Sequence, residues 1–166
     1  MCCEALRSKG GWFRLLDESV GRAKACGLIG RTSRCAIDAT GLETRHISRH
    51  YVWRSDQSRY GMRKWPKLTV VYDIDCHVAL SLHRCVGPCQ DSPQFAPAMR
   101  EAAKRQVITQ VLADKGYDAE HNHALCREEL SIPSTVIAVK RNTNGTRKWP
   151  KTPYRRAMKR HDNRRG

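Results

Sequence analysis

Val107-Ile-Thr-Gln-Val-Leu-Ala-Asp-Lys-Gly-Tyr-Asp118 is the stretch that decides the fold of this chain. It begins as an apolar run rich in β-branched residues and ends on Asp114, with Gly116 two positions later. Short apolar runs are typical of buried strands in parallel or mixed sheets, and a glycine just beyond one lets the backbone turn away. We therefore expect Asp114 at the carboxyl end of a core strand, where open α/β sheets place their chemistry. The alternative is that Asp114 only caps the helix that follows.

The same design occurs upstream in Arg34-Cys-Ala-Ile-Asp-Ala-Thr-Gly41, where an apolar run ends on Asp38. The two aspartates can meet only if their strands are neighbours in one sheet. Two carboxylates about 4 Å apart repel each other by roughly 4 kcal/mol at an effective dielectric constant near 20, so such a pair usually holds a cation. Because all the ligands would be oxygens, we expect that cation to be Mg²⁺ or Mn²⁺.

Composition indicates one domain and a polyanionic partner. The chain has 166 residues, a net charge of +15 and a pI near 9.9, values that favour nucleic acid over a small molecule. No run of about twenty apolar residues and no apolar leader is present, so we expect a soluble cytoplasmic protein that does not enter a membrane.

Eight cysteines without an export signal favour free thiols over disulfides. The best zinc ligands in the sequence are His83, Cys85 and Cys89, joined by His77 or His121. Their spacing fits no common zinc-finger pattern, so we do not expect a structural zinc.

Two segments combine positive charge with aromatic rings, as surfaces that bind nucleic acid do. The first is Gly41–Lys67, and the second begins at Lys140, where eleven Lys or Arg residues accompany a single aspartate. We interpret the second segment as an electrostatic arm with little that could form a core. The candidate DNA-binding residues are Arg45, Arg49, Arg54, Arg59, Arg63, Lys64, Lys67, Lys115, Lys148, Lys151, Arg155 and Arg156.

The remaining pattern predicts a mixed α/β sheet. A helix that ends near Gly27 precedes the first strand, and a hairpin follows it, with Asp73 and Asp75 interpreted as turn residues rather than metal ligands. Asp91 or Ser92 is the predicted N-cap of the next helix. The expected ranges are helices at 12–25, 95–105 and 117–130, the last capped by Asp118, and strands at 34–40, 68–74, 77–86, 107–113 and 134–139.

The segments Ile37-Asp-Ala-Thr-Gly-Leu42, Val111-Leu-Ala-Asp-Lys-Gly-Tyr-Asp118 and Ser134-Thr-Val-Ile-Ala-Val139 resemble the catalytic domain of DDE transposases from bacterial insertion sequences, of the insertion-sequence-4-like group. The resemblance implies a ribonuclease H-like fold that binds two Mg²⁺ or Mn²⁺ ions and cuts and rejoins transposon DNA ends. It makes Asp38 the first acidic ligand and Asp114 the second. It also implies DNA as the partner, bound by a homodimer.

The chain departs from that family at the third ligand, a glutamate on a helix after the last strand. Beyond Val139 the only acidic residue is Asp162. We therefore expect a truncated and catalytically impaired copy, divided into a helical lead-in (1–33), a partial ribonuclease H-like core (34–141) and a basic tail (142–166). Two alternatives remain open: a non-catalytic DNA-binding remnant, and a ribonuclease H-like nuclease with a third carboxylate elsewhere in its own chain.

Overall fold

The computed structural model of the chain describes residues 11–42, 65–87, 89–140 and 149–163, and its centre is a mixed sheet of five strands. The strands are β1 (Thr32–Gly41), β2 (Trp65–Asp73), β3 (Ala79–Gly87), β4 (Val107–Ala113) and β5 (Ser134–Ile137). Their order across the sheet is β3-β2-β1-β4-β5, with β2 antiparallel to β1 and β3, and with β4 and β5 parallel to β1. The fold is α/β and ribonuclease H-like, as the resemblance implied.

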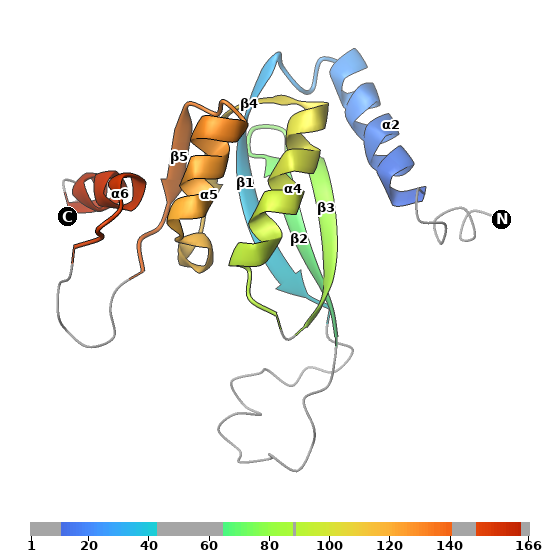
Figure 1. Ribbon diagram of the computed structural model, residues 1–166. Helices are drawn as coiled ribbons and strands as arrows, with labels where there is room; N and C mark the ends of the chain where they lie inside the picture. Colours follow the sequence, from blue (N-terminus) through green and yellow to red (C-terminus); the bar gives the residue numbers. More distant parts are fainter. Residues whose placement is uncertain (1–10, 43–64, 88, 141–148, 164–166) are drawn as a thin grey trace, which may run out of the picture.

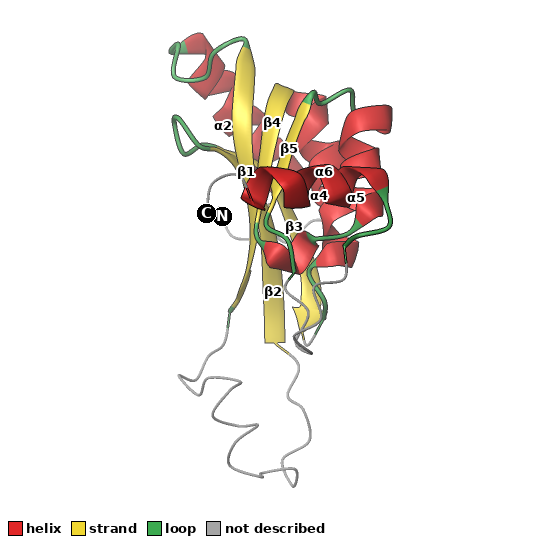
Figure 2. Cartoon of the chain, turned by 90° about the vertical axis from the view of Figure 1, so that its left-hand side faces the viewer, coloured by secondary structure: helices red, strands yellow, loops and turns green. Residues whose placement is uncertain are grey.

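Helices cover one face of this sheet and lie beside its two outer edges. The helices are α2 (Gly11–Ala25), α4 (Ser92–Arg105), α5 (Glu120–Ala124) and α6 (Pro153–Asn163). Helices α4 and α5 lie on the same face of the sheet, α2 lies near β3, and α6 lies beyond β5 (Figures 1 and 2). One face of the central strands is therefore packed against helices.

The core forms between that face and α4. On β1 the side chains alternate, so that Cys35 and Ile37 are buried while Arg34 and Asp38 are exposed. This alternation is the period of two that a strand imposes. The other fully buried apolar side chains between the sheet and α4 are Val71, Leu80, Phe95, Ala98, Met99, Ala102, Val111 and Ile137.

The predicted strands and the first two predicted helices are confirmed, and Gly27, with a φ of +71°, stands just after the end of α2 at Ala25. The turn between β2 and β3 also agrees with its interpretation. Asp73 accepts hydrogen bonds from the backbone N–H groups of Asp75 and Cys76, and Asp75 forms an exposed ion pair with Arg34. Asp91 is the N-cap residue of α4, as predicted, although its side chain makes no capping hydrogen bond.

The helix predicted at 117–130 is wrong in its details. A 3₁₀ turn covers Lys115–Tyr117, α5 begins at Glu120, and a π-helical turn covers Leu125–Glu129. Asp118 is not the N-cap of α5, which is Ala119, but the residue that follows the 3₁₀ turn as its C-cap. Asp118 is instead almost fully buried and bonds to the tail of the chain.

The tail was predicted to be an electrostatic arm with little that could form a core. Residues 153–163 form α6, which contacts α5, and none of the α6 side chains described through His161 is buried. Glu120 accepts hydrogen bonds from the backbone N–H groups of Tyr154 and Arg155, the first-turn donors that a helix leaves unpaired. The basic loop of residues 43–64 and residues 141–148 lie outside the described part of the chain.

Candidate functional site

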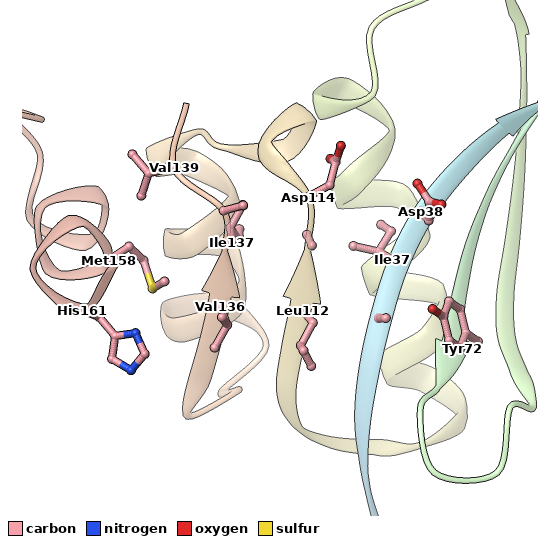
Figure 3. A pocket seen from close by; sticks show the side chains of 13 residues that line it. Ile37, Asp38, Tyr72, Leu112, Asp114, Val136, Ile137, Val139, Met158 and His161 are labelled. Atoms are coloured by element: carbon pink, nitrogen blue, oxygen red, sulfur yellow. The ribbon is translucent and has the colours of Figure 1, made fainter. Parts of the chain in front are cut away.

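Asp38 and Asp114 occupy equivalent places on two neighbouring parallel strands. The register of β1 on β4 pairs Ile37 with Ala113, so each aspartate is the next residue along its strand. Both residues are exposed, and their carboxyl groups point toward the same end of the sheet (Figure 3). The predicted juxtaposition on adjacent strands is confirmed, whereas their use as metal ligands stays a prediction.

Backbone N–H groups orient both carboxylates. Oδ1 of Asp38 accepts a hydrogen bond of 2.7 Å from the N–H of Ala39, and Oδ1 of Asp114 accepts one of 2.7 Å from the N–H of Gly116. Asp114 therefore caps the 3₁₀ turn, which was the alternative role considered from sequence. Capping does not remove it from the site, because a carboxylate has a second oxygen and further lone pairs.

Gly116 permits the close approach of this turn to its surroundings. A Cβ atom at this position would lie 2.8 Å from Oδ1 of Asp114 and 3.3 Å from Oδ2 of Asp91. Glycine is required at this position because a larger side chain would not fit. Asp91, at the start of α4, is a member of the site that sequence reasoning missed, although its place just after β3 put it at this end of the sheet.

Tyr117 lies beneath these carboxylates and is 1% exposed. Burial, followed by the nearby charges of Asp91, Asp38 and Asp114, raises the pKa of Tyr117 above its ordinary value, so the phenol stays protonated. Its hydroxyl and that of Thr69 are buried and meet no partner in hydrogen-bonding geometry among the described residues, although Thr69 lies near enough to offset part of the shift. The charges of all three carboxylates thus act on one buried hydroxyl.

A hollow of about 430 Å³ adjoins Asp38 and Asp114 on the face of the sheet opposite α4 (Figure 3). Its floor is the outward side of the central strands and includes Leu112 and Val136, while Met158 and His161 of α6 form a wall. The site is therefore open on this side, and α6 borders it.

Buried charges hold α6 in place. Arg155 donates two hydrogen bonds, of 2.7 and 2.8 Å, to Asp118, whose side chain is 1% exposed. Burial alone would raise the pKa of Asp118, but the hydrogen bonds from Arg155 and from the backbone N–H of Lys140 outweigh burial and lower it. The Arg155 guanidinium, predicted to contact DNA, is thus bound to a buried carboxylate.

Glu120 lies at the start of α5, and both of its oxygens accept hydrogen bonds from the N-terminus of α6. Burial opposes ionisation of this carboxyl, but those hydrogen bonds lower its pKa below the ordinary value. The structure therefore gives Glu120 a capping role. The side chain of Asp162 lies outside the described part of the chain.

The predicted DNA-binding residues divide into three groups. Lys115 and Lys151 are exposed, and Arg156 is exposed while donating to the carbonyl groups of Pro150 and Lys151. Lys67 is bound within the protein, because its ammonium group pairs with Asp91 and donates a hydrogen bond to the Cys89 carbonyl. The residues outside the described part are Arg45, Arg49, Arg54, Arg59, Arg63, Lys64 and Lys148.

The zinc candidates do not form a ligand set within the described residues. Cys85 and Cys89 are free thiols whose sulfur atoms lie 2.6 Å apart, and burial followed by the hydrogen bond between Cys85 and Cys89 raises the pKa of Cys85 to about 11. No group of three or more His, Cys, Asp or Glu side chains suited to a metal ion occurs in the ranges that the structure describes.

Residues 29–166 match the model of one protein family, which is described as transposase DDE domain. The match covers β1 with Asp38, β4 with the adjoining Asp114, and most of the chain. This chain belongs to the transposase DDE domain family. A comparison with curated proteins gave no match. Within its described residues, this DDE domain has no helix long and apolar enough to cross a membrane.

Proposed function

We propose that this DDE domain acts in DNA transposition by phosphoryl transfer that depends on a divalent metal, with Asp38 and Asp114 as ligands. The observation that carries the proposal is the place of the two carboxylates at the same end of adjacent parallel strands, in a chain that belongs to this family. Asp38 and Asp114 offer only oxygen donors, which suits Mg²⁺ or Mn²⁺.

The donor set fits such an ion. Mg²⁺ is commonly held by one or two protein carboxylates together with water and substrate phosphates, so two aspartates are enough to recruit it. When bound, the metal supplies Lewis-acid activation of a water or 3′-hydroxyl and stabilises the charge of the leaving oxygen. Asp38 and Asp114 fix its place at the strand ends.

DNA is the proposed partner, with transposon ends as the specific substrate and a second copy of the chain in the DNA complex. The net charge of +15 favours a polyanion. Lys115 follows Asp114 directly and is exposed, so its ammonium group is placed to contact a phosphate beside the metal. We also propose that the mobile element is insertion-sequence-4-like and that the protein acts in the cytoplasm.

We expect cleavage by this polypeptide alone to be slow. No glutamate occurs beyond Val139, and Glu120 is engaged with the backbone of α6. This observation favours a second candidate, a DNA-binding remnant that does no chemistry. The two candidate functions differ in whether a divalent metal ion affects DNA binding.

The deciding experiment measures the affinity for a DNA duplex with and without Mn²⁺. If the metal lies between the two aspartates and a phosphate, Mn²⁺ should tighten DNA binding, and DNA should tighten Mn²⁺ binding by the same factor. Asp38→Asn and Asp114→Asn should abolish that increment, whereas Asp75→Asn, at the exposed turn, should keep it. Equal DNA affinity in the presence and absence of Mn²⁺ would favour the remnant.

A further inference from the structure

Lys67 and Asp91 form a half-buried ion pair next to the turn that carries Asp114. The Lys67 side chain is 14% exposed and that of Asp91 is 34% exposed. Lys67 also donates a 3.0 Å hydrogen bond to the carbonyl of Cys89, in the loop that leads to Asp91. The lysine therefore binds both the backbone and the side chain at the entrance to α4.

The carboxylate of Asp91 faces in two directions. Oδ1 pairs with Lys67, and Oδ2 lies against Gly116. Oδ1 of Asp114 and Oδ2 of Asp91 are both within 3.3 Å of a single point, the place of a Cβ atom on Gly116. Asp91 therefore packs directly on the residue whose N–H orients the Asp114 carboxylate.

The charge of Asp91 would oppose this arrangement if it were not neutralised. Two carboxylates this close repel each other, and burial of one without a partner adds a further cost. Lys67 supplies the counter-charge from β2, where its register partner is Gly41 of β1. The ammonium group thus reaches the start of α4 from the strand beside Asp38.

We propose that Lys67 and Asp91 are positioning residues for Asp114. The ion pair holds Asp91 against Gly116, which fixes the Lys115–Tyr117 turn and with it the direction of the Asp114 carboxylate. The proposal rests on the proposed function, because it treats Asp114 as a metal ligand. It assigns to Lys67 a role in the site in place of the DNA contact predicted from sequence.

The test is Mn²⁺ binding by calorimetry to the full chain and to variants at the ion pair. Lys67→Met and Asp91→Asn should each weaken Mn²⁺ binding by about tenfold, the size typical of residues that orient a metal ligand. Lys67→Arg keeps the ion pair and should restore most of the affinity. Arg100→Met breaks the exposed pair with Glu129 and should leave Mn²⁺ binding unchanged.

The sign of the Lys67→Met effect separates positioning from simple electrostatics. If Asp91 acted only through its charge, removal of Lys67 would leave more negative charge near the ion, and Mn²⁺ would bind more tightly. Tighter Mn²⁺ binding by Lys67→Met would overturn the proposal. Unchanged Mn²⁺ binding by both Lys67→Met and Asp91→Asn would also overturn it.

A second measurement does not depend on the metal. Hydrogen exchange at the Gly116 amide, which donates to Asp114, should be severalfold faster in Lys67→Met and in Asp91→Asn than in the natural chain or in Arg100→Met. Unchanged exchange would refute the positioning role by itself. Failure of the natural chain to bind Mn²⁺ would refute the proposed metal ligands instead, and the exchange rates would still decide the role of the ion pair.

Discussion

Replacement of Arg155 by leucine should destabilise the fold by much more than the loss of an ordinary ion pair. Arg155 makes both of its hydrogen bonds to Asp118, whose carboxylate is 1% exposed, and only the backbone N–H of Lys140 remains as a further donor in the described residues. Arg155→Leu therefore leaves a buried carboxylate with little compensation.

The magnitude follows from burial. Removal of one partner from a buried ion pair costs about 3–5 kcal/mol, and the 30% exposure of Arg155 places this case near about 3 kcal/mol. The matched control is Arg100→Leu, which removes a two-bond pair with Glu129 whose side chains are 49% and 50% exposed. Exposed ion pairs contribute little because water screens them, so Arg100→Leu should cost much less stability than Arg155→Leu.

The pH dependence has a definite sign. Because hydrogen bonds to Arg155 outweigh burial, the pKa of Asp118 in the folded chain lies below the ordinary value of 3.8. Its contribution to stability is therefore fully present above pH 3.8 and is lost as the pH falls through the lower, folded pKa. In Arg155→Leu burial dominates, so that Asp118 binds a proton more readily. The stability difference between the natural chain and the variant should shrink from pH 7 to pH 3.

The assay is urea unfolding followed by circular dichroism at both pH values, with hydrogen exchange of the α6 amides as the local readout. We expect α6 to exchange faster in Arg155→Leu and to be unaffected in Arg100→Leu. An Arg155→Leu cost at pH 7 equal to that of the control would refute the reasoning. A difference that persists undiminished at pH 3 would show that the lost stability does not come from the Asp118 charge.

Three further outcomes follow from the site. Gly116→Ala should displace the Asp114 carboxylate and weaken Mn²⁺ binding by about tenfold. Gly21→Ala, where an added Cβ meets nothing within 4 Å, should instead stabilise α2 by about 0.5–1 kcal/mol, and equal Mn²⁺ affinity in both variants would contradict the space argument. DNA affinity should fall by roughly 10³–10⁵ between 50 and 200 mM salt if six to ten phosphates are neutralised, and a flat response in a binding titration would exclude phosphate contacts. Strand cleavage with Mn²⁺ should be at least about 10²–10³ slower than for a complete site, and rapid cleavage that disappears in Asp114→Ala would mean that a third ligand is present after all.

The sheet was predictable because its signal is local. The apolar runs before Asp38 and Asp114 form the buried parts of β1 and β4, and the parallel pairing of these strands places the two aspartates side by side. β4 ends just before Asp114, whereas β1 continues past Asp38 to Gly41. The turn between β2 and β3 was equally predictable, because Asp73 accepts hydrogen bonds from N–H groups only two and three residues away. Interactions of this range leave a pattern in the sequence.

The errors involve partners far apart in the chain. Asp118 resembles a helix cap locally, but Arg155, 37 residues later, binds its carboxylate. The strongly basic segment 153–163 was interpreted as an arm, although Tyr154, Ala157 and Met158 have the spacing of one helix face. Glu120 caps this helix, and Asp118 pairs with its Arg155. The role of Lys67 was missed for the same reason, because its partner Asp91 is supplied by the loop after β3.

Mn²⁺ binding to the isolated chain tests the central claim most directly, since it asks whether the two strand-end aspartates form a metal site. Calorimetry at low salt should detect binding to the natural chain. Asp38→Asn and Asp114→Asn should each remove most of it, because each deletes one of two charged ligands, while Asp75→Asn retains it. Binding of Mn²⁺ by Asp114→Asn with the affinity of the natural chain would contradict the account.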